Sequence, residues 1–112
     1  MDGLPNIPGL GGLVEKARQM GQQVNELRER LRSETVEAEV GGGMVRATVN
    51  GAGEVVRIEI DPAVIDPEEK EMLEDLLAAA VNQASKKAQE RYREEMSRLT
   101  GGVDVPGLFG LA

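Results

Sequence analysis

The fold is decided by residues 35–60, TVEAEVGGGMVRATVNGAGEVVRIEI. Apolar and polar residues alternate there in three short runs, 35–40, 44–49 and 55–60, and a period of two is typical of half-buried strands. The runs are separated by Gly41-Gly42-Gly43 and Asn50-Gly51-Ala52-Gly53, and such segments favour tight connections with positive φ angles. The stretch therefore predicts a three-stranded antiparallel meander.

Helical periodicity flanks the meander on both sides. Before it, apolar residues recur at alternating spacings of three and four, as in a coiled-coil seam, at Leu10, Leu13, Ala17, Met20, Val24, Leu27 and Leu31. After it, Asp66-Pro67-Glu68-Glu69 offers an N-cap acid, a proline in the first turn and a capping-box arrangement. The second helix then runs to residue 99 and is about 50 Å long. It overhangs so small a sheet, and its distal half must pack on the first helix, a second subunit or both.

These elements predict an α+β fold, α-β-β-β-α, in which two long helices flank the meander. Residues 10–99 form one domain, with a flexible N-terminal arm at 1–9 and a flexible Gly/Pro-containing tail at 100–112. The chain has two aromatic residues, Tyr92 and Phe109, so the core is thin and oligomerisation is favoured. The first residues lack a targeting signal, and the longest apolar run, 76–81, is too short for a bilayer. We expect a cytoplasmic protein with no membrane partner.

The composition argues against an enzyme. The chain contains neither Cys nor His, which removes disulfides, Cys/His zinc sites and histidine-activated nucleophiles. Glu37 and Glu39 alternate along a strand and are expected on its solvent face. The triple glycine leads into no helix and lacks the Gly-Lys-Ser/Thr of a phosphate loop. We expect no catalytic residue, no cofactor, no metal and no small-molecule substrate.

The net charge of −7 argues at first against binding to nucleic acid. The charges are unevenly distributed, however, because residues 33–85 hold twelve acidic and three basic side chains, while 15–32 and 86–98 each hold five basic and three acidic ones. Helix-dipole complementation and solvated ion pairs are the more ordinary explanation of such an asymmetry. The alternative is two basic helical prongs that contact DNA phosphates, through Lys16, Arg18, Arg28, Arg30, Arg32, Lys86, Lys87, Arg91, Arg93 and Arg98.

Asn82 lies among apolar residues of the second helix. It is either a partly exposed polar position or an interfacial Asn that fixes the register of paired helices. The second interpretation gives a dimer interface made of Leu77, Val81, Asn82, Ala84 and Ala88.

Most of the chain, from about residue 10 to 108, carries recognisable motifs. They are Met20 and 24–27 in the first helix, 41–49 in the first hairpin, Asn50-Gly51-Ala52-Gly53-Glu54-Val55, Ile58-Glu59-Ile60-Asp61-Pro62, Asp66, 71–76, 78–84 with Lys86 and Lys87, and Pro106-Gly107. By these motifs the chain resembles the YbaB/EbfC family of bacterial nucleoid-associated proteins. The portion 50–87 is the most specific part of the match.

The resemblance implies a tweezer-like homodimer with projecting helices, which binds duplex DNA in the nucleoid and affects nucleoid organisation and gene expression. It supplies no base-reading residue, so the expected site is a basic surface. The acidic net charge and the ending Leu108-Phe109-Gly110-Leu111-Ala112 depart from the family, and no role of the tail is transferred.

Two other functions stay open for the same helices. In the first, they form a clamp that grips a protein partner such as a recombination factor. In the second, a holdase-like clamp uses Met72 and Met96 to bind unfolded chains. Charge reversal at Arg91 and Arg93 separates them from DNA binding, because an apolar gripping surface survives that change.

Overall fold

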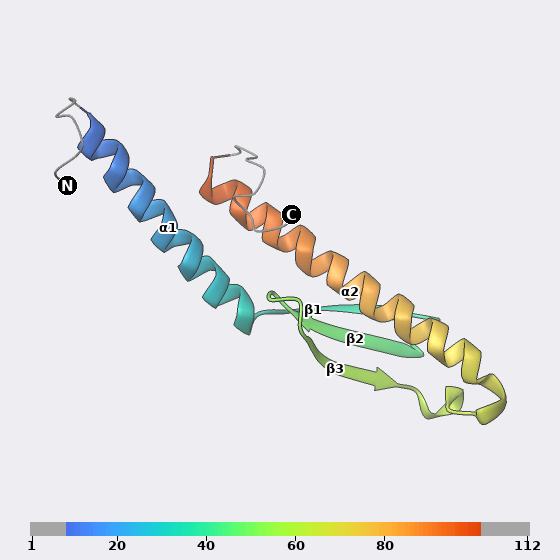
Figure 1. Ribbon diagram of the computed structural model, residues 1–112. Coiled ribbons are helices and arrows are strands. Elements are labelled where there is room, and N and C mark those ends of the chain that lie inside the picture. The colour runs from blue at the N-terminus through green and yellow to red at the C-terminus, as the bar shows by residue number, and fades with distance from the viewer. Residues whose placement is uncertain (1–8, 102–112) are drawn as a thin grey trace.

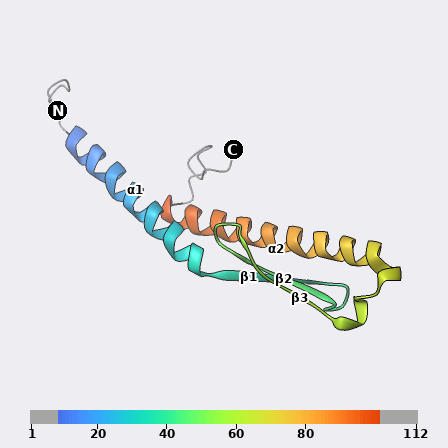
Figure 2. The ribbon, with the colours of Figure 1, turned by 60° about the horizontal axis from the view of Figure 1, so that its bottom comes forward.

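The computed structural model describes residues 9–101 and confirms the α-β-β-β-α order. Its elements are α1 (Leu10–Ser33), β1 (Thr35–Val40), β2 (Val45–Asn50), β3 (Val55–Ile60), the short 3-10 helices η1 (Pro62–Val64) and η2 (Pro67–Glu69), and α2 (Lys70–Leu99). Helix α2 crosses one face of the sheet and continues beyond it, where α1 runs alongside (Figures 1 and 2). The expected flexible arms at 1–9 and 100–112 fall almost entirely outside the described residues.

The sheet is an antiparallel meander in the order β1-β2-β3. The register pairs Ala38 with Ala47 and Ala47 with Ile58, so these three residues share the face that α2 covers. A bulge between Thr48 and Val49 shifts the pairing of β3. Such a bulge adds an unpaired residue and twists the strand. The strand alternation predicts the sheet but not this bulge.

Glycine performs a different task in each hairpin turn. Gly41, Gly42 and Gly43 all have positive φ angles, 62°, 67° and 91°, which only glycine adopts without strain. In the second turn the positive φ belongs to Gly53 and not to the Asn-Gly pair that the sequence favoured. Gly51 is required for space instead, because a Cβ atom there would lie 2.3 Å from the carbonyl oxygen of Leu31.

This close approach joins α1 to the sheet. The Gly51 N–H donates to the carbonyl oxygens of Leu31 at 2.8 Å and of Glu34 at 3.1 Å. Asn50 is buried beside it, and its Oδ1 accepts hydrogen bonds from the N–H groups of Ala52 and Glu54, both at 3.0 Å. The end of α1 is therefore held against the turn between β2 and β3 by main-chain hydrogen bonds.

The second helix begins with a tight turn. Asp66 caps this turn as predicted, because its carboxylate accepts from the Glu68 N–H at 3.0 Å. Residues Pro67–Glu69 form a 3-10 turn, however, and the α-helix begins at Lys70. The Glu69 N–H donates a hydrogen bond to the main-chain carbonyl oxygen of Asp66 at 2.9 Å.

Two hydrophobic clusters hold the protein together. In the first, α2 packs on β1 and β2 through alanines, and their small side chains allow the helix to lie close to the sheet; its buried members are Ala38, Val45, Ala47, Val49, Ala80, Ala84 and Ala88. In the second, α1 packs on the distal half of α2 through Val24, Leu27, Leu31 and Met96, with Met20, Tyr92 and Leu99 at the margin. The overhanging half of α2 therefore meets α1, one of the two partners that its length predicts.

Candidate nucleic-acid interface

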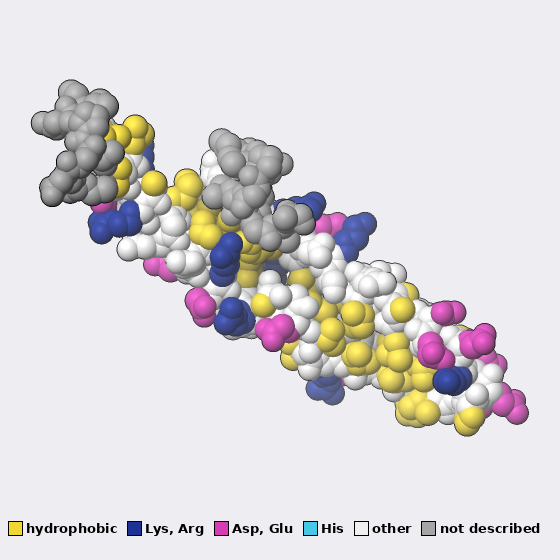
Figure 3. Space-filling model, viewed as in Figure 1, with side chains coloured by type: hydrophobic (Ala, Val, Ile, Leu, Met, Phe, Trp, Pro, Cys, Tyr) yellow, Lys and Arg dark blue, Asp and Glu magenta, His cyan; other side chains and the backbone are white. Residues whose placement is uncertain are grey.

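The ten predicted phosphate-contacting residues lie on α1 and on the distal half of α2. These two segments run side by side beyond the sheet (Figure 1). In the space-filling view, Lys and Arg side chains are spread over this helical end, whereas acidic side chains gather at the opposite tip (Figure 3). The acidic tip includes Glu68, Glu69, Glu71 and Asp75, at the start of α2. The charge separation predicted along the sequence is thus a separation in space.

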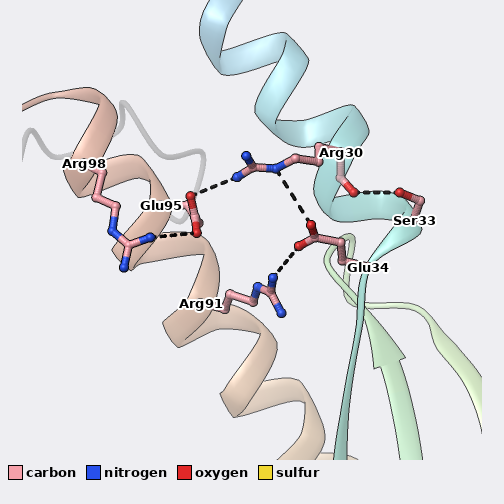
Figure 4. Close-up of polar contacts among 6 residues, drawn as sticks. All are labelled: Arg30, Ser33, Glu34, Arg91, Glu95 and Arg98. Atoms are coloured by element: carbon pink, nitrogen blue, oxygen red, sulfur yellow. Dashed lines mark hydrogen bonds and ion pairs between the residues drawn. The ribbon is translucent and has the colours of Figure 1, made fainter.

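Three of the ten cations belong to one ion-pair cluster, Arg30, Glu34, Arg91, Glu95 and Arg98, which joins α1 to α2 (Figure 4). The Arg30 guanidinium lies 2.9 Å from Glu95 and 3.9 Å from Glu34. Arg91 contacts Glu34 at 2.5 Å, and Arg98 contacts Glu95 at 3.2 Å. Three arginines thus share two carboxylates, and the cluster keeps a net positive charge.

Three further cations are also engaged within the chain. Arg18 pairs with Glu15 at 2.7 Å, one helical turn away. The Arg28 Nε donates to the Tyr92 hydroxyl oxygen at 3.2 Å, and Lys87 donates to the main-chain carbonyl of Glu37 at 2.8 Å. Such contacts at exposed sites are weak, about 0–1 kcal/mol each, so a phosphate can compete for these side chains.

The remaining four, Lys16, Arg32, Lys86 and Arg93, are exposed. None of them has an ion pair or a side-chain hydrogen bond to any residue within 9–101. Their charges are available without breaking an existing contact. Sequence reasoning places all ten cations correctly on the helices, but it does not separate these four from the six that are engaged.

The neutralising partners are residues that the sequence did not single out. Glu34 follows the end of α1, and Glu95 lies in the last turns of α2. The spacings of Arg30 and Glu34, four residues apart, and of Glu95 and Arg98, three residues apart, are signals readable from the sequence. The contacts of Arg91 with Glu34 and of Arg30 with Glu95 span 57 and 65 residues, respectively, and depend on the fold.

A shallow groove of 430 Å³ lies between the two helices. It is lined by Gln23, Glu26, Leu27, Arg30, Glu95, Arg98 and Leu99. Two arginines and two glutamates therefore face this groove. An anion is attracted by the two arginines only where it displaces the two carboxylates. The groove therefore suits an extended phosphate chain that crosses its rim better than a small molecule held inside it.

The outer face of the sheet carries a second charged network. Arg46 lies between Glu39 on β1 and Glu59 on β3, donating through Nε to Glu39 at 2.8 Å and through Nη1 to Glu59 at 3.3 Å. The hydrogen bond and the charge of Glu39, together with the charges of Glu59 and Glu37, raise the pKa of the Arg46 guanidinium above its ordinary value. This face is acidic on balance, and it is a poor surface for phosphates.

The five predicted dimer-interface residues occupy three different environments. Ala84 and Ala88 are buried inside the protomer against the sheet and offer no surface to a second subunit. Leu77 and Val81 are half-buried at the margin of the same cluster, and Asn82 is exposed. The sequence pattern did not point to β3, where Val56 and Ile58 are 58% and 41% exposed.

Groups that could hold a metal ion and helices that could span a membrane are both absent from residues 9–101. Within that range, no three His, Cys, Asp or Glu side chains are grouped to hold a metal ion. Neither α1 nor α2, the long helices of that range, combines the length and the apolar character needed to cross a membrane.

The fold and the basic helical end define a small α+β protein with a charged helical surface, and comparison with known proteins identifies its family. Residues 7–103 match the YbaB/EbfC DNA-binding family. The chain belongs to this family, which is a DNA-binding family and not a family of enzymes. The resemblance expected from the sequence is thereby confirmed.

The relatives cover nearly the whole chain. The nucleoid-associated protein Teth514_0034 of Thermoanaerobacter sp. (strain X514) is 48% identical over 107 residues, 96% of each chain. A nucleoid-associated protein of Pelotomaculum thermopropionicum is 47% identical over 97 residues, 87% of this chain and 92% of its own. Among solved structures, uncharacterized protein HP0035 from Helicobacter pylori matches with a TM-score of 0.61 and 30% identity, over 72% of this chain and 93% of that one.

Proposed function

We propose that the protein binds duplex DNA as a homodimer through the helical end formed by α1 and the distal half of α2. The observation that carries the proposal is the set of four exposed and unengaged cations, Lys16, Arg32, Lys86 and Arg93, on these helices. Phosphate contacts dominate affinity for DNA. The six engaged cations form a reserve that phosphates recruit by displacing the carboxylate, hydroxyl or carbonyl oxygens that hold them. Membership of the YbaB/EbfC DNA-binding family supports the same partner.

The proposed contacts are to phosphates and not to bases. Both helices belong to a packed pair, held by the second hydrophobic cluster and by the Arg30–Glu95 contact. Neither helix lies in a helix-turn-helix or another arrangement that inserts a recognition helix into the major groove. Phosphate contacts position a protein without reading sequence. Any preference then comes from the spacing of the two helical ends in the dimer.

The dimer itself is argued from an uncovered apolar strip. Val56 and Ile58 of β3 are exposed on an edge strand, and α2 packs mainly on β1 and β2. Exposed apolar edge strands pair readily with another chain. Hydrophobic side chains also gather over the sheet and the adjoining part of α2 on the face shown in Figure 3. We place the dimer surface there, with Leu77, Val81 and Asn82 of the predicted set on α2 beside it.

The proposed location is the cytoplasmic nucleoid. Relatives that match 96% and 87% of this chain are named nucleoid-associated proteins. A dimer with two basic ends contacts a duplex twice and constrains the path of the DNA between the contacts. Effects on nucleoid organisation and gene expression follow from such constraint.

The direct test of DNA binding is a gel-shift titration of the purified protein against duplex DNA at several salt concentrations. If about four phosphates are neutralised, the logarithm of the binding constant falls with the logarithm of salt concentration with a slope near −3.6. A salt-insensitive complex contradicts phosphate contact. No shift at low salt contradicts DNA binding altogether.

The dimer is tested by sedimentation equilibrium. Val56→Lys places a charge in the proposed surface and is expected to yield monomers. Arg57→Ala is the matched control. Arg57 follows Val56 on the same strand, but it lies on the other face of the sheet, where it pairs with Glu59. A dimer that survives Val56→Lys refutes this surface.

The alternative clamp functions need an accessible apolar seam. Val24, Leu27 and Leu31 of the seam are buried between α1 and α2, and Met96 is fully buried. Within residues 9–101 these groups face each other and not a partner, and only Met72 of the two methionines proposed for a holdase is exposed. DNA therefore remains the proposed partner, and a protein held on the exposed first half of α1, where Leu13 is 67% exposed, is the second candidate.

A further inference from the structure

We propose that the C-terminal segment of the same chain, residues 102–112, packs on an apolar strip along the first half of α1. This strip is the part of the α1 seam that α2 does not reach. It begins at Met20 and includes Ala17, Leu13 and Leu10, with Val14 at its edge. Leu13 is 67% exposed, although it lies in line with the buried half of the seam, and Val14 at the edge of the strip is 45% exposed.

The strip begins where α2 ends. Leu99, the last residue of α2, packs on the second hydrophobic cluster together with Met20. Figures 1 and 2 both show α1 continuing past the end of α2. The seam residues from Val24 onward pack on α2 in the second hydrophobic cluster, and those before Met20 are not part of that cluster.

The chain leaves α2 in a turn. Thr100 donates its N–H to the Met96 carbonyl at 3.0 Å, and Gly101 donates to the Arg98 carbonyl at 3.4 Å. Gly101 has a φ of 67°, the left-handed conformation that commonly ends helices. The main chain therefore leaves the helical direction two residues after Leu99, which packs on the same cluster as Met20, where the uncovered strip begins.

The composition of the segment suits an apolar partner. Residues 102–112 read GVDVPGLFGLA and contain Val103, Val105, Leu108, Phe109 and Leu111. Asp104 is the one charged side chain in this segment. The distance also fits. Ten helical residues from Met20 back to Leu10 span about 15 Å, and eleven extended residues reach about 36 Å.

The absence of cysteine from the chain makes cross-linking a clean test. The double variant Leu13→Cys with Phe109→Cys is expected to form a disulfide within one chain under mild oxidation, detected as a monomeric species two hydrogens lighter. The matched control is Gln22→Cys with Phe109→Cys. Gln22 is exposed and closer to the end of α2, but it lies on the helix face opposite the strip.

Three outcomes overturn the proposal. They are no intrachain disulfide, equal cross-linking in the Gln22 control, or a disulfide that forms only between chains, which makes a second copy the occupant. Circular dichroism checks that each variant is folded.

Hydrogen exchange on the cysteine-free protein gives an independent readout. Phe109→Ser is expected to accelerate exchange of the amides of residues 13–20 and to leave those of residues 24–31 unchanged. Unchanged protection over residues 13–20 refutes the packing of this segment. Neither experiment involves DNA, so the result does not depend on the proposed function.

Discussion

Two arginines on α2, two residues apart, are expected to differ sharply in their contribution to DNA binding. Arg93 is exposed and has no ion pair within residues 9–101, whereas Arg91 contacts Glu34 at 2.5 Å. A phosphate that recruits Arg91 must first replace the carboxylate of Glu34. Arg93→Gln therefore removes a free cation, and Arg91→Gln removes one that is already neutralised.

The size of the difference follows from counterion release. In a homodimer Arg93 occurs twice, so Arg93→Gln removes up to two phosphate contacts and makes the slope of log K against log salt shallower by about 1.8. At 0.1 M salt the same change lowers the binding constant by about 60-fold. For Arg91→Gln the slope is expected to change by less than about 0.5.

The assay is fluorescence anisotropy of a labelled duplex, titrated with each variant at salt concentrations from about 0.05 to 0.2 M. Circular dichroism and sedimentation show that both variants keep the fold and the oligomeric state of the parent. Equal slopes for the parent and Arg93→Gln refute the assignment of Arg93 to a phosphate. A larger loss for Arg91→Gln refutes the reasoning that an ion pair withholds a cation.

Three further predictions follow from the packing and the ion-pair cluster. Gly51→Ala forces a Cβ atom to within 2.3 Å of the Leu31 carbonyl oxygen and is expected to lower the free energy of unfolding in urea by about 1–3 kcal/mol; an unchanged denaturation midpoint contradicts the close approach. Met96→Ala empties the fully buried centre of the α1–α2 contact and is expected to cost about 2–5 kcal/mol, whereas the exposed Met72→Ala changes the midpoint little. Glu34→Gln releases Arg91 and leaves Arg30 paired with Glu95 alone, so duplex affinity is expected to rise and the salt slope to steepen; weaker binding contradicts this expectation.

Periodicity predicts the element order because each element buries one face. The seam from Leu10 to Leu31 and the alternation of β1, β2 and β3 are local patterns with single solutions, and the helix and strand bounds agree closely with the structure. The exceptions are interactions between distant parts of the chain. The space that Gly51 leaves for Leu31, and the β3 bulge, depend on how neighbouring segments meet.

The position of the ten cations on the two helices was predictable from the sequence, but the number of them that are neutralised was not. Composition by segment locates the ten cations, since the charges lie on known helices. Which of them are neutralised depends on Glu34 and Glu95, whose contacts with Arg91 and Arg30 join residues more than fifty positions apart. The dimer surface posed a related difficulty. An apolar helix face such as Ala84 and Ala88 suits a sheet or a second subunit equally well, and here it covers the sheet.

The two hydrogen bonds from the Gly51 N–H have a consequence for how the charged surface can change. They join main-chain atoms of the β2–β3 turn to the carbonyl groups at the end of α1. The direction in which α1 projects is thus set by these backbone atoms and by its packing on α2, and Lys16 and Arg32 have no ion pair or side-chain hydrogen bond that takes part in it within residues 9–101. Substitutions at Lys16 or Arg32 alter the charge offered to a partner while the helix keeps its orientation. Geometry and charge are therefore separable in this protein, and binding strength can vary among related chains without any change in shape.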